Sequence, residues 1–124
     1  MNHNRKENES PLCIEAWGWK YHHMGIPTSE KKAEEKFIPQ LGMHVSGFPD
    51  SPVGVEWMRF EPGSPVNELV RELPHIAFEV PDLDEALSKA EFRLLSAPSI
   101  PMQGLRVAMI EHNGVPVEIM EFSD

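Results

Sequence analysis

The chain contains the same two sequence motifs twice, in the same order. The segment 23–28 resembles 75–80, and 55–60 resembles 117–122, so each copy offers one histidine early and one glutamate late. Such an internal repeat predicts two copies of one structural unit. If the copies pair around a pseudo-twofold axis, two imidazoles and two carboxylates converge on one point, which predicts a metal site. The four residues are His23, Glu56, His75 and Glu118.

The composition fits one soluble domain. The chain has 124 residues, of which 40% are hydrophobic and 25% charged, and this is ordinary for a globular protein. The net charge of −9 argues against nucleic-acid binding and against an anionic membrane surface, because both depend on Lys and Arg. The single Cys13 suits a reducing cytoplasm, and the polar N-terminus lacks the apolar core of a secretory signal. We therefore expect a cytoplasmic protein that binds a small molecule and contacts neither nucleic acid nor membrane.

The first copy is the less regular of the two. Residues 1–11 are predicted to form a disordered polar tail, and the apolar segment 12–21 a first strand or an arm over the domain. Further along, the pattern predicts strands at 22–28, 43–48 and 53–61, a helix over 30–38 and one or two helical turns within 66–73. The domain then spans 12–124, with module one at 12–62, a linker at 63–73 and module two at 74–122.

The second copy has clearer signals. A strand at 75–80 leads to Asp82, which with Glu85 forms a capping-box pattern for a helix over 83–90. A strand at 92–97 and a proline-containing loop at 98–104 precede strands at 105–111 and 115–122, joined through Asn113-Gly114, a strong hairpin signal. The histidines are 52 residues apart and the glutamates 62, so the second copy is 10 residues longer between its candidate ligands. This predicts that the first copy has lost or shortened a strand.

Strand alternation places the four candidate ligands on one face of the sheet. Successive strand residues point to opposite faces, so His23 shares a face with Gly25, and His75 with Ala77, away from the face that packs on the helix. Phe78 and Val117 are expected on the helix side. His22 is expected to point away from His23, although a register shift of one residue would exchange the two. The concave face would also carry apolar side chains that form the walls of a pocket. These candidate substrate contacts are Met58, Phe60, Met120 and Phe122.

Four segments in this order resemble the vicinal oxygen chelate superfamily, which includes glyoxalase I, methylmalonyl-coenzyme A epimerase, extradiol dioxygenases and bleomycin-resistance proteins. The segments are 22–26, 37–43, 75–83 and 113–118, and the resemblance covers 21–122. It implies an α+β fold of two paired βαβββ modules, the first shortened, that form a cupped mixed sheet with helices outside. It also implies a homodimer.

The resemblance further implies a metal-dependent lyase or isomerase. By position, the ligands of one divalent ion (Ni, Co, Zn, Mn or Fe) would be His23, Glu56, His75 and Glu118. The ion would stabilise the enolate of a carbon acid, with Glu118 or Glu56 as the base. Arg59 and Arg106 are candidates for contact with an anionic substrate, or for surface ion pairs.

Two other functions remain open. A non-catalytic binding protein of the bleomycin-resistance kind would keep the cup without the metal. A ring-cleaving dioxygenase would use His23, His75 and Glu118 on Fe²⁺ as two histidines and one carboxylate, and would leave Glu56 without a role. One fold hosts many chemistries, so the resemblance does not choose among the three.

Overall fold

Eight strands form a single mixed sheet in the computed structural model, which describes residues 5–89 and 91–123. The strands are β1 (Lys20–Pro27), β2 (Lys36–Ile38), β3 (Met43–Ser46), β4 (Val55–Phe60), β5 (His75–Glu79), β6 (Arg93–Met102), β7 (Leu105–His112) and β8 (Val115–Phe122). The helices are α1 (Leu12–Glu15), α2 (Glu68–Glu72) and α3 (Leu83–Leu87), with single 3₁₀ turns η1 (Pro39–Leu41) and η2 (Phe48–Asp50). This architecture confirms the predicted α+β class.

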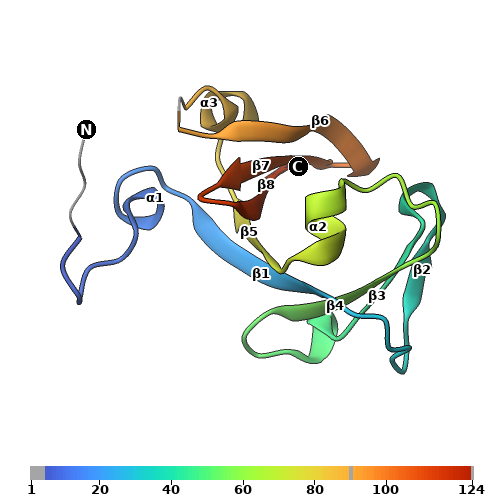
Figure 1. Ribbon diagram of the computed structural model, residues 1–124. Coiled ribbons are helices and arrows are strands. Elements are labelled where there is room, and N and C mark those ends of the chain that lie inside the picture. Colours follow the sequence, from blue (N-terminus) through green and yellow to red (C-terminus); the bar gives the residue numbers. More distant parts are fainter. Residues whose placement is uncertain (1–4, 90, 124) are drawn as a thin grey trace.

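The strand order, β2-β3-β4-β1-β5-β8-β7-β6, places the two copies of the repeat edge to edge. Within each copy the first and last strands are parallel (β1 with β4, β5 with β8), and the copies join through the antiparallel pair β1–β5. The sheet curls strongly, and α2 lies across its open side (Figure 1). The curl brings the two ends of the sheet together, since Gln40 Nε2 in η1 donates to the Pro101 carbonyl of β6 at 3.4 Å.

The second module folds largely as the sequence predicts. The Asp82 side chain accepts the backbone N–H of Glu85 at 3.0 Å, which caps α3. The helix ends at Leu87, earlier than predicted, and residue 90 lies outside the described residues. Asn113 and Gly114 both have positive φ, 52° and 78°, as a tight two-residue hairpin requires.

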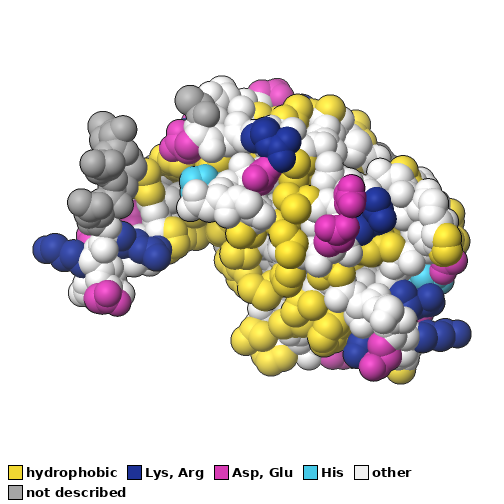
Figure 2. Space-filling view, viewed as in Figure 1, with side chains coloured by type: hydrophobic (Ala, Val, Ile, Leu, Met, Phe, Trp, Pro, Cys, Tyr) yellow, Lys and Arg dark blue, Asp and Glu magenta, His cyan; other side chains and the backbone are white. Residues whose placement is uncertain are grey.

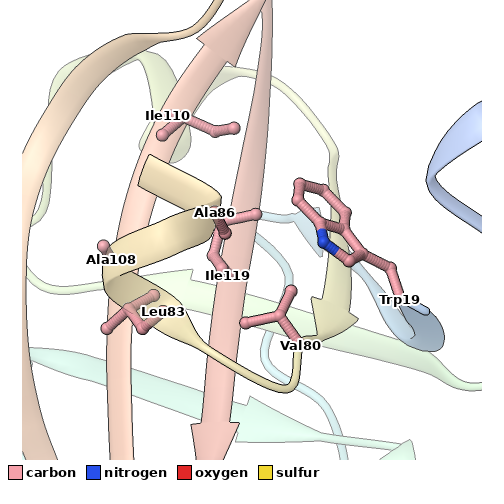
Figure 3. Packing of buried hydrophobic residues seen from close by; sticks show 7 residues of the cluster. All are labelled: Trp19, Val80, Leu83, Ala86, Ala108, Ile110 and Ile119. Carbon is pink, nitrogen blue, oxygen red and sulfur yellow. The ribbon is translucent and has the colours of Figure 1, made fainter. Parts of the chain in front are cut away.

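The main hydrophobic core lies between α3 and the outer face of the second module (Figure 3). Leu83 and Ala86 of α3 pack against Ala108, Ile110 and Ile119 of β7 and β8. Phe78 and Val117 also pack on this cluster, as predicted for side chains on the helix side of the sheet. The second module therefore keeps the complete strand–helix–strands unit.

The first module lacks the predicted helix over 30–38. Residues 28–35, all of them described, form a loop in which Glu34 has a positive φ of 58°, and 36–38 form the short strand β2. The Glu35 carboxylate accepts two hydrogen bonds from Arg59, at 2.7 and 2.9 Å, and another from the backbone N–H of Lys32. Lys32 lies 4.3 Å above the Trp57 ring. This polar loop occupies the outer face that α3 covers in the second module.

The shortening of the first copy thus has two parts. Its second strand, β2, has three residues against ten in its counterpart β6, as the spacing predicts. All four strands of the first copy are present. The rest of the shortening is therefore the missing helix.

Strand β6 corrects a second prediction, the loop over 98–104. The strand continues through Pro98 and Pro101 to Met102, with three register shifts against β7. Proline is tolerated at an edge strand and at bulges because the missing N–H faces away from a neighbour. β6 is the last strand of the sheet, so it meets this condition.

The segment 12–21, predicted as a first strand or an arm over the domain, joins a strand only at Lys20 and Tyr21, which begin β1. It forms the short helix α1, followed by Trp17 and the buried Trp19, whose rings pack edge to face 5.2 Å apart. Trp19 is part of the main core, so this segment belongs to the folded domain. Residues 1–4 of the predicted disordered tail lie outside the described residues.

The surface carries mixed charge. In Figure 2, Lys and Arg side chains lie beside Asp and Glu, and no basic patch covers the visible face. Hydrophobic side chains gather over β1, β5 and the loop before β4 (Figure 2). The exposed apolar residues include Tyr21 and Val53, whose backbone carbonyl accepts the Tyr21 hydroxyl at 2.7 Å. No described helix is long and apolar enough to cross a bilayer.

Candidate metal centre

The strand register brings the four candidate ligands into two adjacent rows on the concave face. In one row Glu56 of β4 pairs with Gly25 of β1, which in turn pairs with His75 of β5. The other row consists of His23, Ala77 and Glu118. Each row has the form histidine, small residue, glutamate, and each takes its histidine and its glutamate from different copies. The pseudo-twofold relation inferred from the repeat therefore appears directly in the pairing.

The side chains of these rows meet at short distances. His75 Nε2 lies 3.1 Å from Glu118 Oε1, and His23 Nε2 lies 3.3 Å from the same oxygen. Glu56 Oε1 lies 3.7 Å from His23 Nε2. The ligand atoms of His23, His75 and Glu118 all lie within 4.8 Å of one another, which makes them a possible metal-binding triad. The two histidines are 5% and 2% exposed, so their rings are shielded from bulk water, whereas the Glu56 and Glu118 side chains are partly exposed, at 22% and 17%.

Gly25 is the residue that allows the His75 ring to take this position. A Cβ atom added at Gly25 would lie 2.2 Å from His75 Cε1 and 2.8 Å from both ring nitrogens. Real Cβ contacts are essentially never that short, so the imidazole rests directly against bare backbone. The site therefore requires glycine at position 25, because this residue lies beside His75 in the same row.

The cluster perturbs the pKa values of its members in different directions. Burial alone would raise the pKa of Glu118, but hydrogen bonds from His23 and His75 outweigh it and lower the value to about 2. Burial favours the neutral ring of His23, yet the hydrogen bond and charge of Glu118, with the charge of Glu56, raise its pKa overall. For Glu56 burial dominates and raises the pKa. The two glutamates thus differ: one is held firmly as a carboxylate, the other has a greater affinity for a proton.

The donor set fits a divalent ion. Ligand atoms bound at about 2.1 Å around one ion stand about 3.0 to 3.4 Å apart. The distances from Glu118 Oε1 to His75 Nε2 (3.1 Å) and to His23 Nε2 (3.3 Å) fall in this range. The distance from Glu56 Oε1 to His23 Nε2 is slightly longer, at 3.7 Å. His75 Nδ1 is buried without a hydrogen-bond partner among the described residues. Hydrogen bonds to these residues therefore satisfy only one of the two ring nitrogens of His75. Imidazole and carboxylate suit Zn²⁺, Fe²⁺, Co²⁺, Ni²⁺ or Mn²⁺.

His22 lies nearer the cluster than alternation predicts. The β1–β5 pairing shifts register between Tyr21 and His23, so a β-bulge falls at His22 and interrupts the alternation. The His22 Nδ1 atom lies 2.8 Å from His23 Nδ1. Its ring stacks on Phe48 at 5.2 Å and packs against Phe122 at 5.7 Å. The adjacent histidines in the sequence were the available signal, but only the bulge makes both of them neighbours of the site.

The residues predicted to form the pocket walls lie in three different surroundings. Met58 and Met120 occupy equivalent positions in the two copies and are almost fully buried. Phe122 is half exposed beside His22. Phe60 lines a separate cavity of about 440 Å³, together with Pro27 and Arg71 among others, and none of the triad lines it. The roles of all four as substrate contacts stay predictions.

The two candidate arginines lie in ion pairs away from the triad. Arg59 is bound by Glu35 and lies 3.6 Å from Glu61, in the polar loop region of the first module. Arg106 contacts Glu121 at 3.2 Å and Asp84 at 3.1 Å. These contacts match the alternative of surface ion pairs.

Comparison with known proteins gives a likeness of fold. No family model matches the sequence, and no curated protein resembles it closely enough to count as a relative. Among solved structures, a hypothetical protein of Bacillus halodurans C-125 is similar with a TM-score of 0.65 and 18% identity, over 86% of this chain and 96% of that one. Methylmalonyl-CoA epimerase of Mycobacterium tuberculosis is similar with a TM-score of 0.59 and 19% identity, over 85% of this chain and 89% of that one.

Such low identities establish the fold only. They show that the curled sheet of paired modules is a fold already known from solved structures. Together the fold and the triad define the class of protein as a glyoxalase-like α+β domain with a possible metal centre.

Proposed function

We propose that this chain is a metal-dependent isomerase or lyase that removes a proton from the carbon beside a carbonyl group in a small oxygenated substrate. The observation that carries the proposal is the meeting of two histidines and two glutamates, one pair from each copy, on the concave face. The fold shared with an epimerase supports it. A purely binding protein would not need four such groups in one place.

Three residues would hold the ion: His23, His75 and Glu118, whose ligand atoms lie closest together. A bound divalent ion would supply positive charge that offsets the negative charge developing on a substrate oxygen. Glu118 suits the role of ligand because its pKa of about 2 keeps it ionised across the working pH range. Met58 and Met120, both buried, help to exclude water from the concave face.

Glu56 is the better candidate for the base. Its carboxylate makes no hydrogen bond to another described side chain, so its oxygens are free to accept a proton from a substrate carbon. Its closest charged neighbour is His23 Nε2, at 3.7 Å. Burial raises the Glu56 pKa, which makes it a stronger base than Glu118. In an isomerase the protonated Glu56 carboxyl would return the proton to the neighbouring carbon, whereas an epimerase would need a second acid on the opposite face of the substrate.

Metal loading and hydrogen exchange test the proposal together. We expect the purified protein, stripped and then loaded with Co²⁺, to hold one ion per chain, and His75→Ala to lose it. With the loaded protein in D₂O, NMR should detect deuterium at the α-carbon of methylmalonyl-CoA, or conversion of the methylglyoxal–glutathione adduct. Glu56→Gln should keep the ion and slow exchange by about 10²–10⁴-fold. His112→Ala, at the exposed hairpin, is the matched control. Failure of the wild type to bind any of the five candidate metals would refute the proposal.

One observation favours a second function. The triad itself consists of two histidines and one carboxylate, the ligand set of Fe²⁺ oxygenases. In that case Glu56 would have no part in the reaction. Oxygen consumption by the Fe²⁺-loaded protein with catechol, undiminished in Glu56→Gln, would favour the dioxygenase over the isomerase.

We also propose a homodimer. The edge strand β6 exposes Leu94, Ile100 and Met102 by half or more of their surfaces, and an uncovered apolar edge favours pairing with another chain. Light scattering after size-exclusion chromatography should give a mass near twice 14.1 kDa. A monomer at micromolar concentration would contradict this.

A further inference from the structure

The His22 ring is held in one orientation by its neighbours. It stacks almost parallel on Phe48, with 5.2 Å between ring centroids and 10° between planes, and Phe122 packs on it at 5.7 Å. Offset or tilted aromatic packing of this kind restricts rotation about the side-chain bonds. Its Nδ1 therefore has a fixed direction, and that direction is toward His23.

The two adjacent rings share one hydrogen. Their Nδ1 atoms are 2.8 Å apart, so one nitrogen must donate and the other accept. His23 Nε2 faces the opposite way, toward Glu118 and Glu56. A ring that offers its Nε2 lone pair to an ion must carry its own hydrogen on Nδ1. In that state His23 Nδ1–H donates and His22 Nδ1 accepts.

We infer that His22 is a positioning residue for the metal centre: it fixes the orientation and the tautomer of His23, so that the Nε2 lone pair points into the triad. This inference rests on the proposed metal-binding function. Partners of this kind commonly set both the ring angle and the ligand strength of a metal-binding histidine. His22 contacts neither the ion nor the substrate in this role.

The second copy holds its histidine differently. The position equivalent to His22, 52 residues further on, is Pro74, whose side chain has no hydrogen-bonding group. Accordingly, His75 Nδ1 has no partner among the described residues. The His75 ring is positioned by packing against Gly25. On the Nδ1 side of the ring, His23 is therefore held by a hydrogen bond and His75 by steric contact.

The test compares His22→Phe with His22→Asn. Phenylalanine keeps the stacking on Phe48 but removes the acceptor, whereas the asparagine Oδ1 can take the place of Nδ1. We expect Co²⁺ binding to weaken by about 10–100-fold in His22→Phe and to recover to within a few-fold of wild type in His22→Asn. His112→Phe is the control for loss of a histidine elsewhere.

A spectroscopic measurement needs no variant. Long-range ¹H–¹⁵N NMR spectra of the Zn²⁺-loaded wild type should show His23 with its hydrogen on Nδ1. If His22→Phe binds Co²⁺ as tightly as wild type, or if His23 carries its hydrogen on Nε2, the inference is overturned while the metal centre stands. If the wild type binds no ion, the inference and the proposed function both fail.

Discussion

Replacing Gly25 with alanine places a methyl group against the ring of His75. The new Cβ would lie 2.2 Å from Cε1, and ordinary contact begins at 3.4 Å, so the ring must withdraw by about 1.2 Å. A metal ligand tolerates deviations of only about 0.2 Å. We therefore expect Gly25→Ala to weaken Co²⁺ binding by at least roughly 10–100-fold. The unfolding free energy of the metal-free protein should fall by about 1–3 kcal/mol, the usual cost of overpacking.

A double-mutant cycle isolates the contact that causes this loss. If the methyl group clashes only with the imidazole, Gly25→Ala should cost less than about 0.5 kcal/mol in a His75→Ala background. Urea denaturation gives the free energies, and the visible absorption of bound Co²⁺ gives the affinities. Equal destabilisation in both backgrounds would show that the strand, and not the ring, rejects the methyl group. Wild-type Co²⁺ affinity in Gly25→Ala would refute the role assigned to the glycine.

Four further predictions concern the charges and the core. Co²⁺ affinity should fall when titrations are taken from about pH 8 to 5, because a proton on His23, whose pKa is raised, competes with the ion; a flat profile would contradict this. The contribution of the His23–Glu118 contact to the stability of the metal-free protein should be greatest between pH 4.5 and 6.5, since the stabilisation from His23 is lost as pH rises through its raised pKa and that from Glu118 as pH falls toward about 2. Leu83→Ala, in the fully buried contact of α3 with the sheet, should lower the unfolding free energy by about 2–5 kcal/mol in urea denaturation. Asp82→Ala should cost about 1 kcal/mol through loss of the helix cap, and Asp82→Asn should restore most of it.

The second module was predictable because its local signals agree with its tertiary contacts. Asp82 both starts α3 in the sequence pattern and caps it in the structure. Asn113-Gly114 specifies a hairpin by backbone preference alone. The alternation that places Phe78 and Val117 toward the helix is the one the core requires. Where local and long-range preferences coincide, one sequence is enough.

The first module was harder because long-range ion pairs decide its structure. The segment 30–38 has helix-forming residues, but Glu35 binds Arg59, 24 residues away, and this contact fixes a loop. Nothing in the local pattern predicts that partner. Strand β6 presents the same difficulty in another form: its prolines indicate a loop, and only its place at the edge of the sheet makes them compatible with a strand.

The candidate centre was predictable as far as strand alternation holds. His23, Glu56, His75 and Glu118 come together from the repeat and the face they share. The position of His22 was not predicted, because a β-bulge is set by pairing between β1 and β5 and leaves no local mark in the sequence. Gly25 was placed on the correct face, but its function depends on the position of a ring 50 residues away.

The two modules differ most in parts of the fold that supply no candidate ligand. The missing helix and the short β2 lie at one end of the sheet, whereas the four candidate ligands come from its four central strands, β4, β1, β5 and β8. These strands keep the symmetric pairing, with one small residue, Gly25 or Ala77, between the histidine and the glutamate of each row. Loss of outer structure in one copy therefore leaves the geometry of the centre unchanged. A substitution that enlarges either small residue acts on the site directly, whereas changes to the polar loop around Glu35 should alter stability without altering metal affinity.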